Sequence, residues 1–267
     1  MNNKYIIALI TFLIAILAPI IVFGEKEAEK KEAKDKYEVP SHVLDIAKEN
    51  TFPNSTEDEE VIEPSELTQE LMESTDVPIS NPNLIKMLNE TSLDPSPIGI
   101  GYRGMVFLGR WPLHYESDDT NINWEYQKIN VNELNNFGGK ENQKLNYNQQ
   151  AQKEIKGALT NKIANPDDVK QMMIMTAKQA TKLPLSYTTT IGAGTKKENS
   201  YSVPSQKYGY LHAFAPAVNE KGKVTFGEVY IQLKGTKKYL VVKNVTKQGI
   251  GAWIPIQDHV SFSFELK

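Results

Sequence analysis

Regular alternation of apolar and polar side chains in the second half of the chain constrains the fold most strongly. Between positions 208 and 264, short alternating runs are separated by residues that favour turns. Val229, Ile231 and Leu233, for example, fall on one face of an extended chain, with more polar neighbours on the other. This two-residue period is typical of a strand with one buried face. The segment therefore predicts an antiparallel β-meander.

Turn-forming residues divide this meander. We expect the Asn-Glu-Lys-Gly-Lys segment at 219–223 to connect two strands as a hairpin before Val224. A second turn at 235–238 leads into a strand that begins at Tyr239, and the last strand covers residues 260–266. Further strand-like runs lie N-terminal to the meander, over 98–111, 120–131 and 185–191.

Helix-start signals lie mainly before and between these runs. Ser65, Asn81 and Asn165 each stand where a side chain can cap a helix, and the last two are followed by proline. Weaker patterns predict short helices over 41–48 and 149–159. The resulting expectation is an α+β fold in which an antiparallel sheet is covered by a few short helices.

The N-terminal 24 residues are expected to be a signal peptide or an N-terminal anchor. Residues 6–23 are almost wholly apolar and follow a positive charge at Lys4. A helix of that length would rise about 27 Å, just short of the roughly 30 Å hydrocarbon core, which favours cleavage over retention as an anchor. The sequence thus predicts an exported protein, secreted or held at the outer face of the cytoplasmic membrane, with membrane association through residues 6–23 if they are retained.

A charged spacer over residues 25–38 follows, and a single α+β domain is expected over 39–267. The spacer alternates acids and lysines with almost no apolar side chain, so burial cannot offset the entropy of ordering it. The chain contains no cysteine, which excludes disulfides, thiolate catalysis and cysteine-ligated zinc. An exported protein without disulfides fits the outside of a Gram-positive cell better than a disulfide-forming periplasm.

The charge is nearly balanced overall but unevenly distributed. The formal net charge of -3 gives no support for nucleic-acid binding. Positions 45–76 carry eleven acids against one lysine, and positions 195–247 carry ten lysines against three glutamates. The lysine-rich part is either solvated surface or a surface that faces an anionic wall polymer or lipid headgroups.

Familiar catalytic and cofactor motifs are absent or fail in context, so no cofactor, metal site or catalytic residue is predicted. Gly-Ile-Gly-Tyr-Arg-Gly at 99–104 matches a dinucleotide fingerprint by letter, but a strand-like run follows where that motif needs a helix. Gly-Ala-Gly-Thr-Lys-Lys at 192–197 lacks the spacing of a phosphate loop and predicts a turn between strands.

Carboxylates and a histidine gather only at His114, Asp118 and Asp119. These residues could supply oxygen ligands for calcium or a general base, although their spacing is not that of a calcium-binding loop. The simpler interpretation is a solvated connection between two strands.

Two tryptophans are weak binding candidates. Trp111 and Trp253, in a chain rich in tyrosine, could line a glycan-binding groove, although such residues more often pack against a sheet. Glycines and a proline surround Trp253 in the segment 249–255 and predict a shaped loop that presents its ring.

Several long strings resemble the YfkD-like family of Gram-positive bacteria. They are the segments 121–127, 191–197, 215–224 and 249–258. The resemblance covers nearly everything after the spacer. It implies a family with a signal-like N-terminus and no established activity, so it transfers no functional residue to this chain.

Three functional hypotheses remain open at this point. The first is a non-enzymatic protein of the cell envelope that binds a protein or wall-polymer partner through its sheet and the loop at Trp253. The second is an envelope hydrolase that uses carboxylates such as Asp118 or Asp119. The third is a module that binds a small ligand or calcium.

Overall fold

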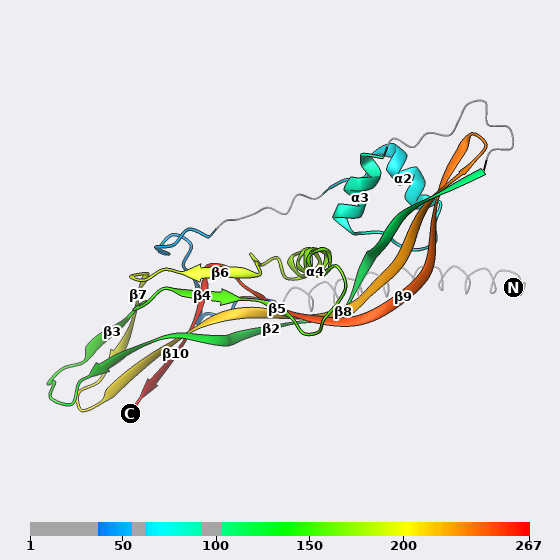
Figure 1. The fold of residues 1–267 in the computed structure, drawn as a ribbon. Coiled ribbons are helices and arrows are strands. Elements are labelled where there is room, and N and C mark those ends of the chain that lie inside the picture. The colour runs from blue at the N-terminus through cyan, green and yellow to red at the C-terminus, as the bar shows by residue number, and fades with distance from the viewer. Residues whose placement is uncertain (1–36, 55–61, 92–102) are drawn as a thin grey trace, which may run out of the picture. The chain divides into compact units, whose positions relative to one another are not determined.

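A computed structural model describes residues 37–54, 62–91 and 103–267 (Figure 1). The chain divides into two units, Met1–Ser41 and His42–Lys267, and every helix and strand named below belongs to the second. The predicted export segment 1–24 and the spacer up to residue 36 lie outside the described residues. Within the described ranges, no helix has the length and hydropathy needed to cross a membrane.

Strands dominate the described residues, and the α+β prediction is confirmed: 54% of the structure is strand and 15% is helix. The helices are α2 (Glu66–Glu73), α3 (Pro82–Asn89) and α4 (Pro166–Thr181). The strands are β1 (Val43–Asp45), β2 (Arg103–Asn135), β3 (Gln143–Asn148), β4 (Lys153–Lys156), β5 (Ala158–Leu159), β6 (Thr188–Ile191), β7 (Lys196–Val203), β8 (Tyr208–Lys234), β9 (Lys237–Pro255) and β10 (His259–Leu266).

The main sheet is built on β8, which pairs along its whole length with β2. This antiparallel ladder runs from Arg103 opposite Lys234 to Asn135 opposite Tyr208 and is interrupted by five register shifts. The other edge of β8 pairs first with β10 and then with β9, and β1 and β5 extend the sheet beyond them. The predicted turn after Lys234 and the predicted last strand are both confirmed.

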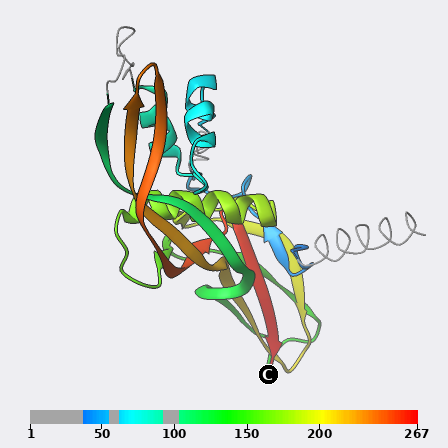
Figure 2. The same cartoon turned by 90° about the vertical axis from the view of Figure 1, so that its right-hand side faces the viewer.

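Helices and two small β-ribbons lie along one side of the main sheet (Figure 1). The first buried cluster lies under α4, where Met172, Met173 and Ala177 meet Val218 and Ile254. Figure 2 shows α4 lying across the strands of the sheet. Burying these side chains supplies the main driving force for this contact.

Two further clusters lie along β8, one on either side of the α4 cluster. Leu71 of α2 and Leu84 of α3 pack against Val229, Ile231 and Leu240. The predicted alternation in β8 is thereby confirmed, since the apolar set is buried. The third cluster includes the buried apolar side chains of the ribbons β3–β7 and β4–β6, which are Leu145, Tyr147, Ile155, Ile191 and Val203.

Two of the three predicted helix caps are confirmed. The Ser65 hydroxyl accepts a hydrogen bond from Thr68 N, and the Asn81 carboxamide accepts from the backbone of Asn83 and Leu84. Helix α4 also begins at the predicted proline. Asn165, however, adopts a left-handed conformation with φ 49° and makes no side-chain cap, so its predicted capping role is wrong.

The expected hairpin at 219–223 is wrong, because β8 continues through it. Gly222 explains the continuity: a Cβ there would lie 2.1 Å from the carbonyl oxygen of Glu116 and 2.6 Å from the Tyr115 hydroxyl. The glycine therefore permits close approach of β2 next to the register shift between Ser117 and Asp119.

Three other local expectations are also corrected. Residues 43–45 form β1 instead of a helix, because they pair with the open edge of β10. The segment 149–159 forms β4 and β5, since Ile155 is fully buried when β4 pairs with β6. The separate strands expected at 98–111 and 120–131 are parts of the single strand β2, as far as the described residues show.

Candidate binding site

His114, Asp118 and Asp119 lie within strand β2, not in a connection between strands, which corrects the sequence interpretation. The structure gives the three side chains separate partners. His114 Nδ1 lies 2.8 Å from the Ser80 hydroxyl, and Asp118 forms an ion pair with Lys223 at 3.2 Å. Asp119 accepts a 2.6 Å hydrogen bond from Asn121, two residues along the same strand.

Burial lowers the pKa of His114 below its ordinary value of 6.5. Glu116 acts in the opposite direction, and Lys247 lowers the pKa further. The neutral imidazole is therefore favoured at neutral pH. In that state, His114 serves as a hydrogen-bond partner for the segment that enters α3.

Trp111 and Trp253 are both held within strands. The Trp111 indole donates a 3.0 Å hydrogen bond to Leu108 O. Trp253 lies in β9, so the predicted loop at 249–255 is wrong. Its ring stacks on Tyr126 with centroids 5.0 Å apart. Each indole is therefore half-buried against its own neighbours, which favours a packing role.

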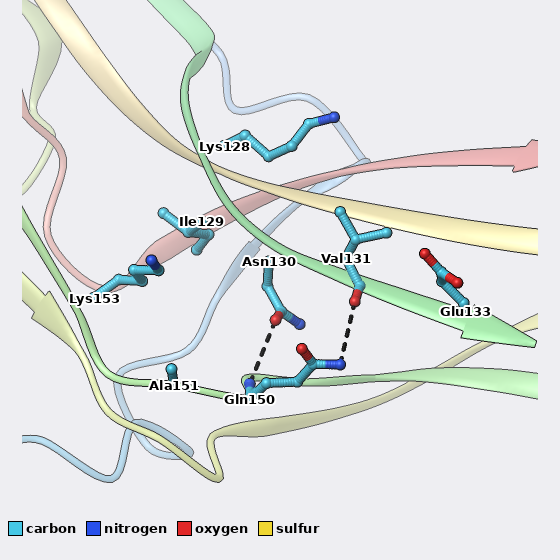
Figure 3. Close-up of a pocket in the computed structure, with 8 residues that line it drawn as sticks. All are labelled: Lys128, Ile129, Asn130, Val131, Glu133, Gln150, Ala151 and Lys153. Atoms are coloured by element: carbon cyan, nitrogen blue, oxygen red, sulfur yellow. Dashed lines mark hydrogen bonds between the residues drawn. The ribbon is translucent and has the colours of Figure 1, made fainter.

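An open groove of about 610 Å³ lies between β2 and the chain that leads into β4 (Figure 3). Charged and amide side chains dominate its lining. The lining residues are Lys128, Ile129, Asn130, Val131, Glu133, Gln150, Ala151 and Lys153. Grooves of this size accept small molecules or a few units of a polymer.

Side-chain amides hold the two walls of this groove together. Gln150 N donates to the Asn130 side chain at 3.4 Å, and Gln150 Nε2 donates to Val131 O at 3.4 Å (Figure 3). Asn130 and Asn132 both donate to Asn148 O, at 2.8 and 2.9 Å. Amide side chains thus replace the strand that would otherwise pair with this edge of β2.

A row of four aromatic rings runs along β8 beside the groove. Tyr208 stacks on Tyr210 with centroids 4.7 Å apart, Tyr210 stacks on His212 at 6.2 Å, and His212 approaches Phe214 at 6.5 Å. The rings are half-buried, and they alternate with the buried residues Leu211 and Ala213, which face the core. This aromatic row therefore lies on the open side of the sheet.

Two charged residues belong to both the groove and the aromatic row. Lys128 Nζ lies 5.4 Å from the centre of the Phe214 ring and 3.3 Å from His212 Nδ1, which accepts a hydrogen bond from the ammonium group. Glu133 accepts a 2.9 Å hydrogen bond from the Tyr208 hydroxyl. The groove and the row thus form one surface that offers amides, both signs of charge and ring edges.

A buried carboxylate elsewhere in β8 is bound by three hydroxyl groups. Glu220 is fully buried and accepts hydrogen bonds from Tyr115 at 2.8 Å, Ser117 at 2.5 Å and Thr120 at 2.6 Å. Among the described residues, no cation pairs with it. Burial, reinforced by the neighbouring Glu220, raises the pKa of the Tyr115 hydroxyl. The hydroxyls solvate the carboxylate in place of water and join β2 to β8.

In the described ranges, no group of three or more His, Asp or Glu side chains is arranged to hold a metal ion.

Sequence reasoning missed the groove and the row as a site. Lys128 and Gln150 are separated in sequence by a turn and by β3, and nothing in either segment has a motif spacing. The one available signal was the run Tyr208, Tyr210, His212 and Phe214, in which four rings follow a two-residue period.

Comparison with known proteins gives one family. The profile described as YfkD-like protein matches residues 40–267. A protein of Bacillus subtilis (strain 168), described as uncharacterized protein YfkD, is 56% identical over 250 residues that cover 94% of this chain and 95% of the relative. No solved structure matches the fold.

Proposed function

Because the chain belongs to the YfkD-like family, which has no established activity, we propose a function from the site itself: this is an exported envelope protein that binds a wall glycan or wall polymer without catalysing a reaction. The observation that carries the proposal is the joining of the polar groove to the aromatic row through Lys128 and Glu133.

The chemistry of this surface suits a polyhydroxylated ligand that carries anionic groups. Amides such as Asn130 and Gln150 can exchange donors and acceptors with sugar hydroxyls. Lys128 and Lys153 can pair with phosphate or carboxylate groups, and the ring edges of the row can contact the apolar faces of sugars.

Export is supported by the apolar run at 6–23 and by the absence of cysteine. A protein that crosses the membrane and folds outside would meet wall polymers as its most abundant neighbours. The groove offers such a polymer a binding surface that needs no cofactor.

The geometry favours binding over hydrolysis at the carboxylates singled out in the sequence. Asp118 is paired with Lys223, and Asp119 accepts from Asn121. A hydrolytic pair needs two carboxyl groups or a carboxyl and a base that face one substrate. His114 instead faces Ser80.

Cosedimentation of the full chain with purified, insoluble cell-wall material tests the proposal. The double variant Lys128→Ala/Lys153→Ala is expected to bind roughly tenfold more weakly or worse, because it removes two charge-assisted contacts. The matched control, Lys140→Ala/Lys144→Ala, removes the same charge from exposed positions outside the groove. An equal loss of binding in both variants would attribute the effect to overall charge. Unchanged binding in both variants would contradict the groove as the site.

A further inference from the structure

A second surface, at the opposite end of β8 from the aromatic row, combines positive charge with exposed apolar side chains. We call it the basic–aromatic face. It consists of Arg103, Met105, Phe107, Arg110, Glu228, Tyr230, Gln232, Lys234, Lys237, Tyr239, Val241 and Lys243.

Contacts and strand register place these residues on one side of the three-stranded ribbon. The Phe107 and Tyr230 rings meet with centroids 5.0 Å apart, and Lys243 Nζ lies 5.2 Å from the centre of the Tyr230 ring. The same Nζ lies 3.5 Å from the Met105 sulfur. Arg103 is directly opposite Lys234, and Lys234 is directly opposite Lys237.

Among the described residues, the helices that cover this ribbon lie on its other side. Val229, Ile231 and Leu233 alternate with the residues of the basic–aromatic face and pack into the cluster that contains Leu71 and Leu84. In the part of the chain that the structure describes, α2 and α3 support one side of the ribbon and no element covers the other (Figure 1).

The charge of the face is strongly positive. Five of its twelve residues are lysine or arginine, and Glu228 is the single carboxylate among them. That carboxylate already accepts hydrogen bonds from the Tyr230 hydroxyl at 2.8 Å and from Asn244 at 2.9 Å. The face therefore carries more positive charge than its own carboxylate can neutralise.

Large apolar side chains lie exposed among these cations. Phe107 is 57% exposed and Met105 is 44% exposed. Single exposed apolar residues are ordinary on a protein surface. Two such side chains in one patch with Tyr230, bordered by cations, match the composition of surfaces that bind the membrane interface.

We infer that the basic–aromatic face docks on the surface of an anionic lipid bilayer, independently of ligand binding in the groove. The cations contact lipid phosphates, and Phe107, Met105 and Tyr230 enter the headgroup region. A hydrated soluble polyanion would satisfy the cations alone and leave Phe107 and Met105 exposed. The bilayer interface is the anionic partner that accepts both kinds of side chain.

The absence of cysteine allows a site-specific test in the full chain. In Phe107→Cys, the single thiol is labelled with an environment-sensitive dye, which restores an apolar group at that position. Vesicles of phosphatidylcholine mixed with phosphatidylglycerol should shift the dye emission to the blue and increase it. Vesicles of phosphatidylcholine alone should not. High salt should abolish the response, because the screening length falls to about 3 Å at ~1 M.

Two matched controls separate this docking from membrane binding through residues 6–23 or through charge in general. A dye at Phe137→Cys, which is equally exposed outside the face, should remain in an aqueous environment. Lys234→Glu/Lys237→Glu should weaken the Phe107 response roughly 25-fold or more, at about fivefold per basic side chain. Lys140→Glu/Lys144→Glu should change it no more than about twofold.

Three results would overturn the inference. The first is an aqueous Phe107 dye on chains that are bound to anionic vesicles. The second is an equal response with neutral vesicles, which would assign insertion to another segment. The third is a response to soluble polyphosphate but not to vesicles, which would assign the face to a soluble polyanion.

Discussion

Removing one hydroxyl from the buried Glu220 cluster gives the sharpest test of the fold. In Tyr115→Phe, the ring remains packed in the cluster under α4, and the 2.8 Å hydrogen bond to the carboxylate is lost. Hydrogen bonds to charged groups contribute about 1.5–3 kcal/mol. The free energy of unfolding should therefore fall by about 1.5–3 kcal/mol, since water cannot replace the hydroxyl beside a fully buried carboxylate.

Urea unfolding, monitored by tryptophan fluorescence, measures this loss. Tyr201→Phe is the matched control, because the Tyr201 ring is half-buried and its hydroxyl has no hydrogen bond among the described residues. The control should stay within about 0.5 kcal/mol of the parent protein. The double variant Tyr115→Phe/Glu220→Gln should reveal a coupling of about 1–3 kcal/mol between the two groups.

The pH dependence of the same variant follows from the raised pKa of Tyr115. Above pH 10, the tyrosine ionises in the unfolded chain before it ionises in the folded chain, so the folded protein loses stability as the pH rises. Tyr115→Phe should reduce this alkaline loss. A stability of Tyr115→Phe equal to that of Tyr201→Phe, or a coupling near zero, would show that the carboxylate does not depend on this hydroxyl.

Three further variants test local features. Asn81→Ala should lower the free energy of unfolding by about 2–4 kcal/mol in urea, because it removes the α3 cap and the 2.7 Å bond to Pro112 O; a loss below about 0.5 kcal/mol would contradict that double role. His114→Gln should flatten the fall in stability as the pH drops below 6.5, since the unfolded histidine binds a proton before the folded one; an unchanged profile of melting temperature against pH would refute this. Gly222→Ala should cost about 1–3 kcal/mol or more, whereas Gly138→Ala, where a Cβ meets nothing within 4 Å, should leave the melting temperature unchanged; equal effects would refute the close-approach argument.

The sequence predicted the parts of the fold that local chemistry determines. Ser65 and Asn81 begin helices because their side chains bond to nearby backbone, and no distant partner is required. The alternation of Val229, Ile231 and Leu233 likewise indicated the buried face directly. The family assignment rests on longer strings and matches residues 40–267.

Features decided by distant partners could not be predicted in this way. The segment 219–223 has the composition of a turn, but β2 on one edge and β9 on the other hold it extended. Residues 43–45 belong to the segment 41–48, whose pattern predicts a helix, but the open edge of β10 pairs with them. The groove escaped prediction for the same reason, since it forms only when Gln150 reaches β2.

The continuity of β2 and β8 has a consequence for how the chain acquires its structure. All three buried clusters include residues of both β2 and β8, so none of them can form completely until these two strands have paired. The two partners are far apart in sequence, and pairings of that kind are slow to nucleate because a long loop must close first. Folding is therefore expected to wait for the C-terminal third and then to proceed as a single cooperative event. Such a delay keeps the chain unfolded during its synthesis, in the state that transport across a membrane requires.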